Sequence, residues 1–223
     1  MTLPTSLDRR GAALDRFAPL SGVLFAGLTL GGNLLIGPFP EGSTPAGDLP
    51  AYYDTHAGHV TAGGYLALVG AILGAVFGVS VWSRLRDRSA PPIVLGAVLV
   101  GVAVQTVVAL QNAATCVLLA ELGRDPHVDP GALQAWQIGA SQFGPTGGFG
   151  LVLLAIAAAG IAFRLVPGWL AWAALLLGIA QFTPVGFLAS LLVTALAAVA
   201  GIVLAVRPGA PVPRADSIAL RVG

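Results

Sequence analysis

Residues 61–82 have the sequence TAGGYLALVGAILGAVFGVSVW, a run of 22 residues without a charge. A helix crosses the hydrocarbon core of a bilayer with about 20 apolar residues, because each residue adds about 1.5 Å against a thickness of about 30 Å. The run therefore predicts a transmembrane helix. Four further uncharged stretches extend the pattern to most of the chain, namely residues 17–39, 93–119, 144–163 and 167–206.

The last of these stretches is long enough for two crossings if it turns once. The segment QFTPVG holds a turn signal, since Thr183 is a residue type that caps a helix and Pro184 suits the first helical position. We therefore expect a tight hairpin closed at these two residues. The sequence predicts an all-α fold, a six-helix transmembrane bundle with spans at 17–39, 61–82, 93–119, 144–163, 167–182 and 184–206, and with tails at 1–16 and 207–223.

The arginines predict the orientation of the bundle. With six spans, ten of the eleven arginines fall on one side, and Arg124 alone falls on the other. Cytoplasmic loops of membrane proteins carry the excess of basic residues, so both tails are expected in the cytoplasm. The ten residues are Arg9, Arg10, Arg16, Arg84, Arg86, Arg88, Arg164, Arg207, Arg214 and Arg221.

Composition agrees with this class and excludes others. Hydrophobic residues make up 56% of the chain and charged residues 9%, and the mean hydropathy is +0.86. A net charge of +1 leaves no basic surface for nucleic acid. The single cysteine, Cys116, excludes an internal disulfide. The abundant Ala, Gly and Pro, with arginine as the only basic residue beside histidine, indicate a bacterial chain and hence the plasma membrane.

No Asp, Glu, Lys, Arg or His lies within the six predicted spans. Ionisable side chains at that depth are typical of proton relays and ion coupling, so their absence argues against a pump or a proton-driven transporter. The histidines are too peripheral for haem ligation inside the membrane. No GxxxxGK[ST] motif is present, so we expect no nucleotide as a partner. The sequence predicts a protein that is not an enzyme and has no cofactor.

Neutral polar residues remain inside the spans. Gln105, Ala109, Asn112 and Cys116 share one helical face by their spacing. Gln181, Ser190 and Thr194 follow in later spans. One interpretation is a polar pocket or pore for a small neutral solute, with Gln105, Asn112, Gln181 and Thr194 as its binding residues. The interpretation we favour is hydrogen bonding between helices, which is common in membrane bundles.

A polar cluster precedes the second span. On a helix that starts near Pro50, with Asp48 as its cap, Tyr52, His56 and His59 fall on one stripe. Together with Asp54 and His127 they are a conceivable zinc or copper site, with Asp129 as a further carboxylate. Asp129 is also explained as the cap of a helix at Pro130, and tyrosine and histidine are ordinary residues at a membrane surface. We therefore expect a short interfacial helix over 50–59 and no metal.

Glycines mark the expected helix contacts. Gly70, Gly74 and Gly78 lie on one stripe of the second span, and Gly27 and Gly31 repeat the spacing in the first. Such stripes allow helix backbones to approach closely. We favour packing within one chain over a dimer interface.

Two segments resemble known proteins. LPAYYDTHAGHVTAGGYLALVGAIL resembles the segment of uncharacterised actinobacterial polytopic integral membrane proteins in which an "aYYadH" motif leads into the second membrane helix. RLVPGWLAWAALLLGIAQ is similar to their "lPrWLgWlglvla" connection. The matching positions are Tyr52, Tyr53, His56, Pro167, Trp169 and Trp172, while Gly168 replaces the family's basic residue. The resemblance implies the topology and no activity.

Three functions are compatible with the sequence. The first is a non-enzymatic bundle that acts through a membrane-protein partner or a second copy, or in envelope homeostasis. The second is a facilitator or channel for a small neutral solute. The third is an outer-face metal-binding membrane protein. We favour them in that order, with the lipid bilayer as the partner common to all three.

Overall fold

The computed structural model describes residues 17–38, 40, 44–142, 147–164, 166–183 and 186–206. Within these ranges the chain is helical and has no strand, so the all-α prediction is confirmed. The predicted tails, 1–16 and 207–223, lie outside the described residues. The elements are η1 (Ala18–Leu20), α2 (Ser21–Ile36), η2 (Ala46–Asp48), α3 (Leu49–Asp87), α4 (Pro92–Leu122), α5 (Pro130–Gln142), α6 (Gly147–Ile161), α7 (Gly168–Ala180) and α8 (Gly186–Val206).

Three helical segments are long and apolar enough to cross a membrane, by length and composition. They are Ala18–Ile36, Ala46–Asp87 and Pro92–Leu122, and they contain most of the first predicted span and all of the second and third. The other apolar segments, Gly148–Ile161, Gly168–Ala180 and Leu188–Val203, are shorter. The structure is therefore consistent with membrane association.

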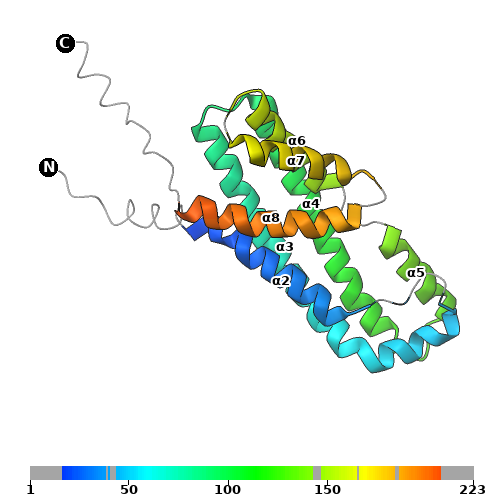
Figure 1. Ribbon diagram of the computed structural model, residues 1–223. Helices are drawn as coiled ribbons and strands as arrows, with labels where there is room; N and C mark the ends of the chain where they lie inside the picture. The colour runs from blue at the N-terminus through cyan, green and yellow to red at the C-terminus, as the bar shows by residue number, and fades with distance from the viewer. Residues whose placement is uncertain are drawn as a thin grey trace, which may run out of the picture.

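The three long helices pack side by side in alternating directions (Figure 1). α2 and α3 touch through their backbones where Gly32 meets Gly63, since a Cβ built on Gly32 would lie 2.8 Å from the Gly63 carbonyl oxygen. At the other end of α2, a Cβ on Gly22 would lie 2.7 Å from the ring of Phe77. On its other side, α3 packs against α4, with Gly64 beside Ala113. Glycines, which have no side chain, thus allow the three long helices to pack closely.

The predicted glycine stripe of the second span is confirmed as packing within the chain. A Cβ on Gly70 would approach Thr29, and one on Gly74 would approach the ring of Phe25, so both glycines face α2. Gly78 faces Val102 of α4. Gly27 and Gly31 differ, because a Cβ added to either meets no atom within 4 Å. The first-span pair therefore does not mark a close helix contact within the described chain.

Residues 50–59 are helical and lead into the second span as predicted, but they do not form a short helix of their own. These residues form the first turns of α3, which continues without interruption for 39 residues. Figure 1 shows that α3 bends, so that its N-terminal turns lie at an angle to the rest. Gly58, Gly63 and Gly64 lie in this region, and glycines are a common cause of helix bending. Asp48 occupies the N-cap position as predicted, but its side chain makes no capping hydrogen bond.

The fourth predicted span, 144–163, corresponds to α6, which covers only Gly147–Ile161. Its start lies beside the middle of α4, where a Cβ on Gly148 would touch the backbone of Gln105. From there α6 runs towards the start of α4, and Ala155 and Ala159 join a buried cluster with Val94 and Val98. A helix of 15 residues is about 22 Å long, which is less than the core of a bilayer.

The predicted turn between the last two spans is present, but the two helices do not pair as a tight hairpin. The chain does break there, because α7 ends at Ala180 and a turn follows at 181–183. However, α7 packs mainly along α6, whereas α8 packs mainly along α2 and η1 (Figure 1). The Thr183 hydroxyl donates back to the Ala180 carbonyl at 2.7 Å, at the C-terminal end of α7. Pro184 lies outside the described residues.

Candidate functional site

Three residues of the predicted polar stripe, Tyr52, His56 and His59, line one groove of about 380 Å³. The ring of Tyr52 stacks on His56 with 4.4 Å between centroids, and its hydroxyl donates to the Pro38 carbonyl at 3.1 Å. His56 Nδ1 lies 2.9 Å from the Tyr52 carbonyl oxygen. The other wall is the end of α2 and the residues after it, 34–38. The shared face is confirmed, and two of its polar groups, those of Tyr52 and His56, bond to nearby backbone carbonyls.

The neighbouring Tyr53 has the opposite environment. Its side chain is fully buried, and its hydroxyl donates to Gln137 Oε1 of α5 at 3.3 Å. Gln137 Nε2 in turn donates to the Pro40 carbonyl at 2.6 Å, and Gln134 Nε2 donates to the Thr44 carbonyl at 2.7 Å. α5 is thereby tied to the α2–α3 connection. Sequence reasoning missed these glutamines, although their spacing of three places them on one face of α5.

The other members of the predicted outer cluster do not join this groove. Asp54 is exposed on α3. His127 lies in the α4–α5 loop, where its backbone N–H donates to Asp125 Oδ1 at 2.9 Å. Asp129 caps α5 as predicted, because its Oδ2 accepts from the Ala132 N–H at 2.9 Å. Among the residues that the structure describes, no three His, Cys, Asp or Glu side chains are grouped to hold a metal ion.

The intramembrane polar residues form two local sets. Gln105 Oε1 accepts from the Phe149 N–H in the first turn of α6 at 3.2 Å. Gln181 Oε1 accepts from the Ser190 hydroxyl at 3.1 Å, and the Thr194 hydroxyl donates to the Ser190 carbonyl at 2.8 Å. Asn112 is half-buried on α4, two turns beyond Gln105. None of these residues lines the groove beside Tyr52.

Both sets lie near the first turn of α6. Gln105 contacts Gly148, and Phe182, which follows Gln181, would meet a Cβ on Gly150. Gln181 is 1% exposed, and its Nε2 has no acceptor among the described residues. A buried amide donor without a partner is uncommon in folded proteins. Of the predicted pocket residues, Gln105 and Gln181 therefore both lie near the start of α6. Each is hydrogen-bonded to a residue of another helix.

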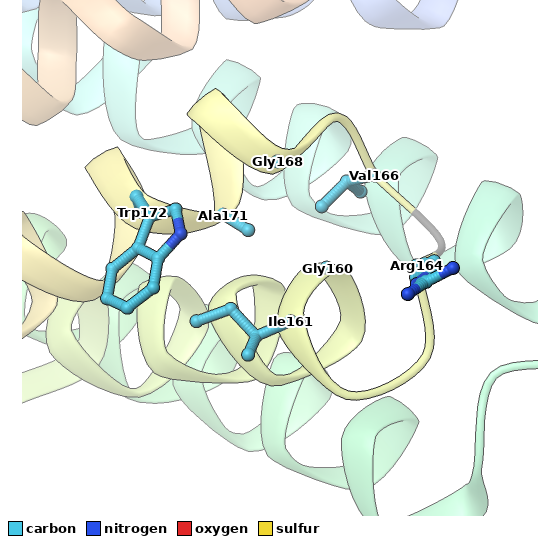
Figure 2. Close-up of a pocket in the computed structure, with 7 residues that line it drawn as sticks. All are labelled: Gly160, Ile161, Arg164, Val166, Gly168, Ala171 and Trp172. Atoms are coloured by element: carbon cyan, nitrogen blue, oxygen red, sulfur yellow. The ribbon is translucent and has the colours of Figure 1, made fainter.

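A second groove lies at the α6–α7 turn and has a volume of about 410 Å³. Figure 2 shows Arg164 at one end of it and Trp172 at the other, with Gly160 and Ile161 of α6 between them. Val166, Gly168 and Ala171 complete the lining. The sequence indicated a basic turn flanked by tryptophan, but it did not indicate a concave surface, which depends on how α6 and α7 cross.

Comparisons of the chain with protein-family models, with curated proteins and with solved structures found no match.

Proposed function

We propose that this chain is a multi-pass protein of the bacterial plasma membrane that acts without catalysis, through contacts with lipids and membrane partners. The observation that carries the proposal is its surface. Large apolar side chains are exposed along the helices, and water-soluble monomers rarely expose patches of that extent. Examples are Leu24, Tyr65, Ile72, Val76, Val100, Val107, Leu176, Leu188, Leu192 and Ile202.

The proposed topology has six membrane segments with both termini in the cytoplasm. The ten-to-one arginine split supports it. The contact of the first and last helices also supports it, since a Cβ on Gly201 of α8 would lie 2.6 Å from the Pro19 carbonyl oxygen. The start of η1–α2 and the last turns of α8 therefore lie at the same end of the molecule. Membership of the actinobacterial family remains part of this proposal.

A specific observation favours a second candidate, a facilitator for a small neutral solute. Gln105 and Gln181 lie where short helices begin and end, and interrupted helices with polar groups at that depth are typical of transporter binding sites. The Nε2 group of Gln181, which has no acceptor among the described residues, is the group that a solute would contact. Outer-face metal binding ranks third, because the described ligands do not gather.

Vesicle permeability separates the first two candidates. The full chain is reconstituted into liposomes, and uptake of glycerol and urea is followed by light scattering. The first proposal expects the permeability of protein-free vesicles. A rise in permeability that Gln181→Leu abolishes, and that Gln134→Leu in α5 leaves intact, would contradict it and establish the facilitator.

Topology is tested separately by thiol labelling of intact cells in a Cys116→Ala background. A cysteine at His127 should react with an impermeant maleimide, and one at Ser89 should react only after the cells are opened. The reverse pattern would refute the orientation.

A further inference from the structure

The groove at the α6–α7 turn combines a charge with an apolar wall. It is concave partly because Gly168 has no side chain, and a Cβ built there meets no atom within 4 Å. The opposite wall is closed, since a Cβ on Gly160 would collide with Ala171. The space between Arg164 and Trp172 is thus open to a ligand from outside the helix pair (Figure 2).

Arg164 is held in a conformation that arginine seldom adopts. Its φ is +52°, in the left-handed region where glycine is usual, and its N–H donates to the Gly160 carbonyl at 3.1 Å in the manner of a helix C-cap. Unfavourable backbone conformations that persist are often associated with functional sites. The conformation fixes the backbone from which the guanidinium extends.

The Arg164 guanidinium has no carboxylate partner in the part of the chain that the structure describes. Arg86 of α3, another arginine beside a tryptophan, does have a partner, because its guanidinium lies 4.9 Å from the centre of the Trp82 ring. An arginine is a five-donor cation that suits a phosphate group. The ligand chemistry that matches the polar end of the groove is therefore an anionic phosphate.

The apolar end of the groove continues along α7. Trp169, Trp172, Leu176 and Ile179 are all more than half exposed and follow a spacing of three, four and three residues. They form one stripe on the helix, here called the α7 stripe. The stripe leads from the groove along the body of the helix, which is the direction that an acyl chain takes from its headgroup.

We propose that this groove binds one anionic phospholipid of the inner leaflet, with its phosphate on Arg164 and one acyl chain along the α7 stripe. The proposal rests on the proposed orientation, because the α6–α7 turn must lie at the cytoplasmic surface. Trp169 and Trp172 at the start of α7 agree with this orientation, since amphipathic rings favour the headgroup region. The occupant is a lipid and not free phosphate, because the groove and the α7 stripe are continuous.

The test measures lipid retention by the purified full chain. Native mass spectrometry follows binding of phosphatidylglycerol and phosphatidylcholine to delipidated protein in detergent. We expect one phosphatidylglycerol to bind preferentially. Arg164→Gln should weaken it about tenfold, as expected for the loss of a charge-assisted hydrogen bond. Arg88→Gln, which removes a charge from the proposed inner side elsewhere, should change it less than twofold.

Two further variants separate the parts of the site. Gly168→Phe fills the groove without removing the charge, and it should also weaken binding about tenfold. Leu176→Gln should weaken lipid binding through the α7 stripe alone. All variants are checked for an unchanged melting temperature, so that lost binding is not confused with unfolding.

Several outcomes would overturn the proposal. Equal retention by wild type and Arg164→Gln would remove the phosphate contact, and equal losses for Arg164→Gln and Arg88→Gln would indicate general charge attraction. Displacement of the lipid by millimolar inorganic phosphate would indicate a site for the free anion. None of these results affects thiol labelling, so failure of the lipid site is distinguishable from failure of the topology.

Discussion

Tyr52 and Tyr53 follow one another in the chain but lie in different surroundings. Tyr53 is enclosed by Gly123 and by buried apolar residues such as Leu133, while Tyr52 borders the groove with His56. Helical geometry turns successive side chains by about 100°, so neighbours in sequence often face different environments. The pair therefore offers a matched comparison of a buried and a partly exposed hydroxyl.

We expect Tyr53→Phe to lower the free energy of unfolding by about 1 kcal/mol, because Gln137 Oε1 loses its buried donor. Tyr52→Phe should cost less than about 0.5 kcal/mol, since water can replace its exposed bond. Denaturant unfolding in detergent micelles measures both. Equal losses, or a larger loss for Tyr52→Phe, would contradict the assigned environments.

Polarity within an apolar run was enough to select Gln105 and Gln181 from the sequence. Their partners were not predictable, because Phe149 contributes a backbone N–H and Ser190 lies on another helix. Arg164 was located as an inner-side charge, but its left-handed backbone conformation has no signature in an arginine side chain. Local chemistry indicates which residues need a partner, and the fold determines which partner they find.

At the scale of elements, the α2–α3 crossing depends on two glycines. A Cβ on Gly63 would lie 2.7 Å from the Gly32 carbonyl oxygen and would also touch Ile36. Backbone atoms cannot move aside as a flexible side chain can, so the helices would have to separate. The exposed Gly27, one turn away, serves as a control on the same helix.

We predict that Gly32→Ala destabilises the protein by about 1–3 kcal/mol, the usual range for overpacking. Gly27→Ala should be neutral or stabilise by up to about 1 kcal/mol, because alanine is the better helix former. Melting temperatures in detergent compare the two. A Gly27→Ala loss as large as that of Gly32→Ala would point instead to a contact made by Gly27 outside the described chain.

Hydropathy predicted the long helices well because they are uninterrupted apolar runs. At α6 and α7 it located the helices but counted uncharged flanking residues, such as Gln181 and Phe182, as part of a crossing. The number of uncharged residues in the sequence then overestimates the length of the helix that they form. A helix of 13 residues, such as α7, is about 20 Å long whatever the composition of its flanks.

At the scale of the whole molecule, the short length of α7 has a consequence for topology. The turn after α7 lies beside Gly150, level with the middle of α4, and α4 continues to Leu122. If the α6–α7 turn lies at the cytoplasmic surface, the tip at Thr183 ends about 10 Å short of the opposite side of a 30 Å core.

We therefore predict that a cysteine at Thr183 resists an impermeant maleimide added to intact cells, while one at His127 reacts. Both should react after solubilisation in detergent. Labelling of Thr183→Cys from outside, at the rate seen for His127→Cys, would show that α7 and α8 each cross fully.

The contact between Pro19 and Gly201 joins residues that are synthesised at opposite ends of the chain. The surface of α2 around Gly22 therefore lacks its α8 neighbour until α8 has been synthesised, so the bundle cannot be completed before then. A chain that stops after residue 183 should reach the membrane yet be degraded faster than the full protein in pulse-chase experiments. Equal half-lives would show that the first five membrane helices mature without their final partner.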